Sequence, residues 1–402
     1  MSIRLNDDAM RQFRVAKVFQ ETEEHKVSLD FSVDGRRLMA CDQAALSIFS
    51  STRQAVLCQV HMHHYHPEVA CFTQQDTRVL HSSSKYDYAI RCLDLESRSC
   101  VRIFSGHSKS VRRLISQPGN ENIFVSAGRD EQVYVWDFRA STHTYHLKKL
   151  RSPQCAFDPA GLVLATSSHT DRIELHDMRM LGEQPCQKFV YQVNDKVRWT
   201  QLQFAPNGKS MLLSTDHSWC FSVSAFDGSF QQSYTGYANQ QRQSLDASFT
   251  PDSQFILSGA DEGRIHIWRA ADGYPVAVLK GNNVGPVRCL RFNPQATMFV
   301  SSDLLIVFWM PMANGVYDWV ECLEPGETVS FKDKQDEKAV KPRQVQKPIS
   351  MPKPKMEVEM LRKRLGSSNW AAKKRARSEV AIVDLTKTED RNPLEDGEIS
   401  DD

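Results

Sequence analysis

The sequence predicts an all-β fold, a seven-bladed β-propeller with a disordered C-terminal tail, from three observations. The stretch 106–137 has the pattern of one four-stranded blade. A turn marker recurs seven times at intervals of 41 to 47 residues. Beyond residue 312 the alternating apolar pattern ends, so we expect the propeller to occupy residues 1–311 and the tail residues 312–402.

The third blade carries the clearest pattern. It opens with Gly-His at Gly106 and closes with Trp-Asp at Asp137, a pairing and separation typical of a WD repeat. Short apolar runs bounded by turn residues lie between them and indicate strands. Four side chains of this stretch have matching donors and acceptors, so we predict that they form a structural tetrad: His107, Ser126, Asp130 and Trp136.

Repetition of the blade distinguishes this interpretation from chance. The marker is the turn after the first strand, usually Phe-x-Pro, and its seven copies end at Val33, Gln74, Pro118, Pro159, Pro206, Pro251 and Pro294. A period of this length is that of propeller blades. The sequence therefore predicts a seven-bladed WD-repeat β-propeller.

After each marker we expect a second strand, a turn and a third strand that ends in an aromatic residue or a substitute. The third strand ends at Trp136 in the third blade, Trp268 in the sixth and Trp309 in the seventh, and His176 takes this position in the fourth. Blades one, two and five lack the tryptophan. The acidic turn residues are predicted to be Asp130, Glu262 and Asp303, each six residues before a tryptophan.

The last blade needs one more strand. Only three strands precede Pro311, and an unpaired edge would remain if the ring lacked a fourth. Residues 14–19 precede the first blade and alternate between apolar and polar side chains. We expect them to close the ring as the outer strand of blade seven.

Several phrases resemble one family closely: FRVAKVF, GYANQQ followed by LDASFTPDSQFI, GRIHIW, and GPVRCLRFNP. They look like the WD-repeat subunit of COMPASS-type histone H3 lysine methyltransferase complexes, over about residues 10–311. The resemblance implies a non-catalytic nuclear, chromatin-associated scaffold that helps recruit a SET-domain methyltransferase to transcribing RNA polymerase II. It also implies service in a nuclear protein phosphatase complex and with termination factors. The chain runs about 90 residues further than such proteins usually do, which is typical of a diverged paralogue.

Composition limits the other function classes. The net charge of +1 gives no global argument for a nucleic-acid or membrane partner, and no run of about 18 apolar residues appears. The cysteines are scattered without paired spacing, which favours reduced thiols over a disulfide framework or a zinc cluster. We therefore expect no metal and no cofactor, and a monomer within larger complexes.

Basic residues recur near the start of the first strand in several blades. We predict that they form an arc that binds an acidic or phosphorylated peptide, consistent with the polymerase tail that the resemblance implies. The alternative is ordinary solvated charge. The candidate residues are Lys109, Arg112, Arg113, Arg198 and Arg288.

Two other patterns have ordinary explanations. Histidines between Val60 and His66 suggest a metal site, but an exposed polar strand and loop explains them better, because only Glu68 accompanies them. No nucleophile elbow, phosphate-binding glycine loop or zinc-protease motif is present. We therefore expect no enzyme and no catalytic residues.

The tail contains three short patterns. A two-part basic cluster is predicted to direct nuclear import and can also make weak nucleic-acid contacts: Arg362, Lys363, Arg364, Lys373, Lys374, Arg375 and Arg377. An isolated apolar run resembles a SUMO-interaction motif: Ile382, Val383, Asp384 and Leu385. The end of the chain, 395–402, is acidic.

The first hypothesis is an adaptor of the COMPASS-associated type. Its partners would be the methyltransferase complex, a phosphatase scaffold and the phosphorylated polymerase tail. The first alternative is a diverged propeller scaffold whose tail binds SUMO or nucleic acid. The second is a substrate receptor of a ubiquitin ligase, a common use of propellers.

Overall fold

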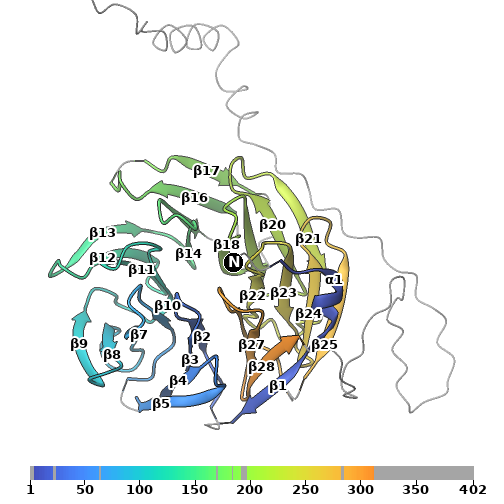
Figure 1. The fold of residues 1–402 in the computed structure, drawn as a ribbon. Coiled ribbons are helices and arrows are strands. Elements are labelled where there is room, and N and C mark those ends of the chain that lie inside the picture. The colour runs from blue at the N-terminus through green and yellow to red at the C-terminus, as the bar shows by residue number, and fades with distance from the viewer. Residues whose placement is uncertain are drawn as a thin grey trace, which may run out of the picture. The chain divides into compact units, whose positions relative to one another are not determined.

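The computed structural model contains seven four-stranded antiparallel sheets arranged around a common axis (Figure 1). It describes residues 4–311 except 21–23, 63–64, 169–170, 183, 192–196 and 282–284. The expected tail, with its basic cluster, SUMO-like motif and acidic end, lies outside the described residues. The seven-bladed propeller predicted from the repeat period is confirmed.

Each blade runs from an innermost strand near the axis to an outermost strand. Blade one contains β2 (Ser28–Phe31), β3 (Arg37–Cys41), β4 (Ala45–Ser50) and β5 (Ala55–His61). Blade two contains β6 (Ala70–Phe72), β7 (Arg78–Ser82), β8 (Ile90–Asp94) and β9 (Ser99–Phe104). Blade three contains β10 (Val111–Ser116), β11 (Ile123–Gly128), β12 (Gln132–Asp137) and β13 (His143–Lys148). Blade four contains β14 (Gln154–Phe157), β15 (Val163–Ser168), β16 (Arg172–Asp177) and β17 (Gln187–Val190).

The remaining blades follow the same order. Blade five contains β18 (Trp199–Phe204), β19 (Ser210–Thr215), β20 (Trp219–Ser224) and β21 (Phe230–Thr235). Blade six contains β22 (Ala247–Phe249), β23 (Phe255–Gly259), β24 (Arg264–Arg269) and β25 (Pro275–Lys280). Blade seven contains β26 (Cys289–Phe292), β27 (Phe299–Ser302), β28 (Ile306–Pro311) and β1 (Phe13–Phe19).

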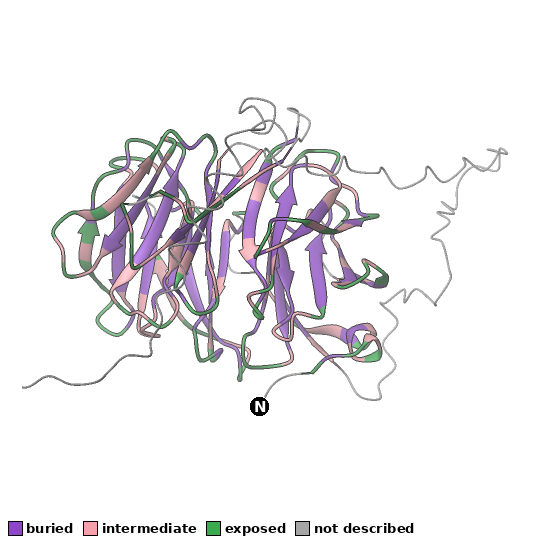
Figure 2. Ribbon diagram, turned by 90° about the horizontal axis from the view of Figure 1, so that it is seen from above, coloured by how far each residue is buried: buried purple, intermediate pink, exposed green. Residues whose placement is uncertain are grey.

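The core lies between neighbouring blades, because both faces of the middle strands are covered. All six residues of β4 are buried, whereas the outer strand β5 of the same blade exposes Val56 and Leu57. Figure 2 shows this arrangement, with buried strands in the interior and exposed residues mainly in the loops at their ends. Packing of the two faces of each sheet against adjacent sheets explains why the strands read as nearly continuous apolar runs.

The outer strand of blade seven comes from the N-terminal end of the described chain. β1 pairs antiparallel with β28, from Phe13 opposite Pro311 to Phe19 opposite Ile306. Phe13 is fully buried, with its ring 5.1 Å from that of Phe299. The ring is thus closed by segments nearly 300 residues apart, which removes the unpaired edge of the last blade.

The one helix in the described residues, α1 (Asp7–Arg11), precedes the closing strand. Asn6 caps it by accepting a hydrogen bond from the Ala9 N–H at 2.7 Å, and Asp7 forms an ion pair with Arg269 at 2.6 Å. The helix packs against β25 of blade six. These contacts hold the N-terminal segment against the blade that lies next to its own.

The loops of a blade fall into two sets, because its strands are antiparallel. Loops that join the second strand to the third, or one blade to the next, lie at the end where the innermost strand begins; we call this the upper face. Turns that join the first strand to the second, or the third to the fourth, lie at the opposite end, the lower face. The predicted basic residues precede or begin innermost strands, so they belong near the upper face.

Candidate functional site

The predicted tetrad side chains of blade three form one continuous hydrogen-bonded chain. The Trp136 indole N–H donates to Ser126 Oγ at 2.8 Å, and Ser126 Oγ lies 2.7 Å from His107 Nε2. The other ring nitrogen, Nδ1, lies 2.9 Å from Asp130 Oδ2. The serine hydroxyl can donate to Nε2 while the Nδ1–H donates to the carboxylate, so every group has a partner.

This network fixes a loop of the upper face. Asp130 Oδ2 also accepts the Ser108 N–H at 3.0 Å, which connects the turn to the loop before β10. Burial would raise the pKa of Asp130, but the hydrogen bonds from His107 and Ser108 outweigh it and lower that pKa. The carboxylate therefore stays ionised and holds the loop in place.

Histidine, aspartate and serine in contact could suggest nucleophilic catalysis, but the geometry indicates a structural role. Ser126 has 0% exposure, and its oxygen accepts the indole N–H. A nucleophile must reach its substrate, and this hydroxyl lies inside the blade. The arrangement stabilises the blade.

Other blades replace members of the tetrad. In blade four His176 occupies the tryptophan position opposite Leu164, and its Nε2 lies 3.2 Å from Thr166 Oγ1. In blade seven the Trp309 indole donates to Ser301 at 2.9 Å. The His176–Thr166 and Trp309–Ser301 pairs each correspond to the Trp136–Ser126 hydrogen bond of blade three.

The predicted turn acid of blade six is wrong. Glu262 is half exposed and pairs with Arg264 at 3.4 Å. The structural carboxylate is that of Asp261, which accepts the Gln240 N–H at 2.6 Å as Asp130 accepts that of Ser108. Counting back from the tryptophan fails here because the Gln240 N–H meets a carboxylate one position earlier in the turn.

Three arginines from blades three and five lie near one another on the upper face. Arg112 is exposed, and its pKa is lowered, first by partial burial and then by repulsion from Arg129 and Arg198. Glu68 lies near and pairs with Arg129 at 3.5 Å. The mutual repulsion of these guanidinium groups would be relieved by an anion bound among them. We call Arg112, Arg129 and Arg198 the upper arginine cluster.

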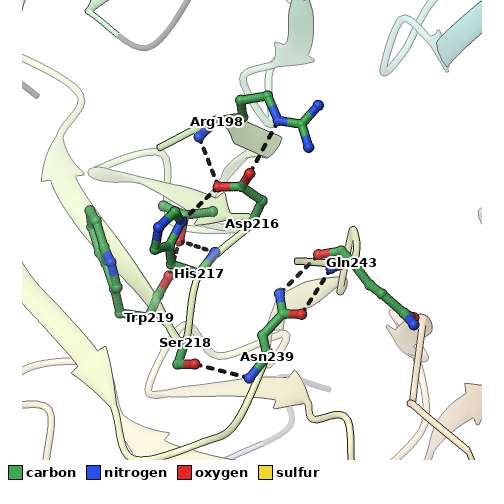
Figure 3. Close-up of polar contacts among 8 residues, drawn as sticks. Arg198, Asp216, His217, Ser218, Trp219, Asn239 and Gln243 are labelled. Carbon is green, nitrogen blue, oxygen red and sulfur yellow. Dashed lines mark hydrogen bonds and ion pairs between the residues drawn. The ribbon is translucent and has the colours of Figure 1, made fainter. Parts of the chain in front are cut away.

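Arg198 is held by a buried carboxylate. Its backbone N–H and its Nε donate to Asp216 at 2.8 and 3.1 Å, and His217 Nδ1 lies 2.8 Å from the same carboxylate (Figure 3). The Arg198 side chain is 65% exposed, whereas that of Asp216 is 2% exposed. Burial would raise the pKa of Asp216, but these hydrogen bonds lower it, so the acid positions the arginine while the far end of the guanidinium faces solvent.

The adjacent loop of blade six is also fixed by side chains. Ser218 Oγ accepts the Asn239 N–H at 2.9 Å, and the Asn239 amide bonds Gln243 through both its nitrogen and its oxygen, each at 2.9 Å (Figure 3). Asn239 is 4% exposed. This loop therefore forms a rigid edge beside Arg198 and His217.

The other predicted basic residues occupy different surroundings. Lys109 is exposed in the loop before β10. Arg288 Nε lies 3.3 Å from Asp303, which also contacts His25 Nδ1 at 2.8 Å. Arg288 thus forms a separate group at blade seven. The sequence analysis missed Arg129, although it adjoins the turn acid Asp130.

Arg113 is separate from its neighbour Arg112. It lines the space around the axis. Burial and repulsion from Arg291 lower its pKa, and attraction to Asp246 and Asp30 only partly offsets this effect. Neighbouring residues of a strand point to opposite sides, and the register of β10 shifts between Val111 and Arg113. The predicted arc therefore does not include Arg113.

Other predictions concern absent features. No group of three or more His, Cys, Asp or Glu residues in the described ranges could hold a metal ion, and His63 and His64 lie outside those ranges. The nine cysteines in the described part of the chain are free thiols. Among the described residues, no helix has the length and apolar character needed to cross a membrane.

Comparisons with known proteins agree with the repeat pattern. The chain matches the family described as "WD domain, G-beta repeat" over residues 98–137, 228–269 and 273–309. It is 36% identical over 315 residues to WD repeat-containing protein 82 of Drosophila melanogaster, covering 78% of this chain and 99% of that protein. It is 30% identical over 328 residues to COMPASS component SWD2 of Saccharomyces cerevisiae, covering 77% and 98%. Set1 complex component swd2 of Schizosaccharomyces pombe is 25% identical over 252 residues, covering 60% and 70%.

Proposed function

Because the chain belongs to the family of WD-repeat proteins that includes WD repeat-containing protein 82 and COMPASS component SWD2, we propose that it is a non-catalytic adaptor of a COMPASS-like histone H3 lysine methyltransferase complex. The observation that supports this most is the 36% identity over 99% of the Drosophila protein. Two similar proteins are named as components of COMPASS or Set1 complexes. We propose a nuclear, chromatin-associated location on the same ground.

The upper arginine cluster is the surface we assign to an anionic peptide. Three guanidinium groups face the carboxylates of Glu68 and Asp216, which leaves an excess of positive charge to which Lys109 adds. Phosphoserine carries nearly two negative charges at neutral pH and pairs well with arginine. A phosphorylated tail of transcribing RNA polymerase II has this chemistry.

The remaining parts of the proposal concern further partners. The second proposed role of this chain is that of a rigid, non-catalytic scaffold in a nuclear protein phosphatase complex. The basic cluster of the tail, 362–377, would direct nuclear import and add weak nucleic-acid contacts. These proposals rest on the family and on the sequence.

Affinity purification of the full-length chain from nuclear extract, with mass spectrometry of the bound proteins, tests the adaptor role. We expect a SET-domain methyltransferase and its core subunits to be recovered. Recovery of ubiquitin-ligase subunits without methyltransferase subunits would replace this proposal with the substrate-receptor alternative. Recovery of neither class would contradict both.

Titration with a serine-phosphorylated peptide tests the upper arginine cluster. The double variant Arg112→Glu/Arg198→Glu should weaken binding by at least about tenfold, because two charge-assisted contacts are replaced by repulsion. Arg53→Glu is the matched control, since Arg53 is exposed in a lower-face turn. Equal loss in the control would show that binding depends only on net charge.

A further inference from the structure

The innermost strands line two cavities, each partly open to solvent, that neither the fold nor the proposed function explains. The first has a volume of about 240 Å³ and lies against β2, β6, β10 and β26. The second has a volume of about 300 Å³ and lies against β10, β14 and β18. Each could hold several waters or one or two amino-acid side chains. They are small compared with most cofactor sites.

Arg113 lines both cavities, together with Ile115 and Ser116. Its Nε–H is buried and has no hydrogen-bond partner among the described residues. A buried donor on a charged group is strongly destabilising when it is left unpaired. The Arg113 Nε–H can therefore pair with an acceptor that enters the cavity, because the described residues supply none.

The two nearby carboxylates already have other partners. Asp246 accepts from Arg291 Nη1 at 3.0 Å, and Asp30 accepts the Phe72 N–H at 2.8 Å. Burial raises the pKa of Asp30 in spite of that hydrogen bond and the nearby arginines. Asp30 and Asp246 thus balance the charges of Arg113 and Arg291, but neither carboxylate accepts a hydrogen bond from the Arg113 Nε–H.

The second cavity also offers an unpaired acceptor. Gln203 Oε1 is buried without a hydrogen-bond partner among the described residues, and Gln203 lines this cavity together with Arg113. An unpaired donor and an unpaired acceptor in one cavity are complementary to a group that carries a carboxylate and an N–H. An acidic amino-acid residue in a peptide is such a group.

The lower-face end of the second cavity is the more apolar of the two, and it favours an apolar flanking sequence. Residues of the lower-face turns line both cavities, including Pro118, Pro159 and Pro206 in the second and Val33 in the first. Val33 is 47% exposed. An occupant that enters from the lower face would thus pass apolar side chains before it reaches the charged layer.

The two cavities share Arg113, and together we call them the channel. We propose that the channel binds a carboxylate at Arg113. The carboxylate belongs to an acidic residue of a peptide that has apolar neighbours and enters from the lower face. The Arg113 Nε–H donates to the carboxylate, and Gln203 Oε1 accepts an N–H of the same peptide. A free small carboxylate has the same chemistry and is the other source. This site is distinct from the upper arginine cluster, so the proposal does not depend on the proposed function.

Nuclear magnetic resonance on the full-length protein provides the test. The probes are N-acetyl-Leu-Asp-Leu-amide, its Asn counterpart and acetate, and the reporter is the Arg113 Nε–H resonance, assigned by its loss in Arg113→Lys. We expect the Asp peptide to shift this resonance and to bind at least about tenfold more tightly than the Asn peptide, because the charge-assisted bond is lost in the latter. The affinities are measured on the unmodified protein, and the variant serves only to assign the resonance.

A second arginine variant provides the control. Arg113→Met should abolish the binding of the Asp peptide, whereas Arg53→Met should leave it unchanged, because Arg53 is exposed in the turn between β4 and β5 and lines neither cavity. A shift with acetate at the affinity of the Asp peptide would support the carboxylate site and assign it to a free carboxylate. No shift with either carboxylate, or an equal loss in Arg53→Met, would overturn the proposal.

Discussion

At the scale of single residues, Ser126 connects side chains that come from three parts of blade three. It accepts from Trp136 on β12 and contacts His107 in the loop before β10. Ser301 occupies the equivalent position in blade seven, where the Trp309 indole is its one side-chain partner among the described residues. The two serines therefore differ in the number of buried partners that each satisfies.

Replacement of Ser126 by alanine leaves two buried ring nitrogens without a partner. We expect Ser126→Ala to reduce the free energy of unfolding by about 1–3 kcal/mol. Ser301→Ala is the matched comparison and should cost less, because it removes one hydrogen bond. Denaturant titration of both variants measures the difference, and a larger loss for Ser301→Ala would contradict this account of the network.

His81 makes stability depend on pH. It is 3% exposed, and burial lowers its pKa to about 4, with a contribution from Arg91 that Asp87 opposes. In the unfolded chain the pKa of histidine is about 6.5, so the unfolded state takes up the proton first as pH falls. The neutral His81 therefore stabilises the fold above pH 6.5, and this contribution is lost between about pH 6.5 and 4.

Thermal unfolding at pH 7 and pH 5 tests this pH dependence. Over that range His81 should account for a loss of about 2 kcal/mol in the free energy of unfolding. His81→Gln removes the titrating group, so its stability should fall less on acidification than that of the unmodified protein. Equal pH dependence of the two proteins would show that His81 is not the group responsible.

Some residue positions could be predicted from sequence and others could not. His107, Asp130 and Trp136 share one short stretch with a regular spacing, so their contact follows from local pattern. The Arg291–Asp246 pair joins different blades, and no local signal indicates it. In blade six the Gln240 N–H bonds Asp261 and not Glu262, a difference of one position that depends on the loop before β22 and that the spacing rule does not include.

At the scale of elements, β1 determines whether blade seven is complete. The sequence predicts a strand at 14–19 because of its alternation and because the last blade lacks a partner, and β1 runs Phe13–Phe19 in that place. By contrast, the shift in the register of β10 between Val111 and Arg113 leaves no mark in the sequence. Strand existence follows from periodicity, whereas a local register shift depends on neighbouring strands.

Truncation of the β1 anchor should destabilise the ring. Phe13 is fully buried against Phe292 and Phe299, so Phe13→Ala should reduce the free energy of unfolding by about 3–5 kcal/mol. Leu57→Ala, in the outer strand of blade one, is the control and should change it by less than about 0.5 kcal/mol, because Leu57 is 50% exposed. Denaturation midpoints measure both, and similar values for the two variants would mean that β1 adds little to closure.

At the scale of the whole propeller, the closed ring presents separate surfaces. The upper arginine cluster lies on one face, and the channel around Arg113 is lined by turns of the other. A ring held by seven sheets keeps these surfaces at fixed positions, as an adaptor requires. The repeat period was sufficient to predict the ring. The partners of each surface depend on side chains from several blades, and the repeat pattern does not show which of these side chains lie close together.

The most direct measurement is quantitative affinity purification from nuclear extract, comparing the full-length protein with its Arg112→Glu/Arg198→Glu variant. An adaptor holds two partners by separable surfaces. We therefore expect the variant to recover as much SET-domain methyltransferase as the unmodified protein, but several-fold less phosphorylated RNA polymerase II. Loss of both partners together, or of neither, would contradict the claim that the upper face links the methyltransferase complex to the polymerase.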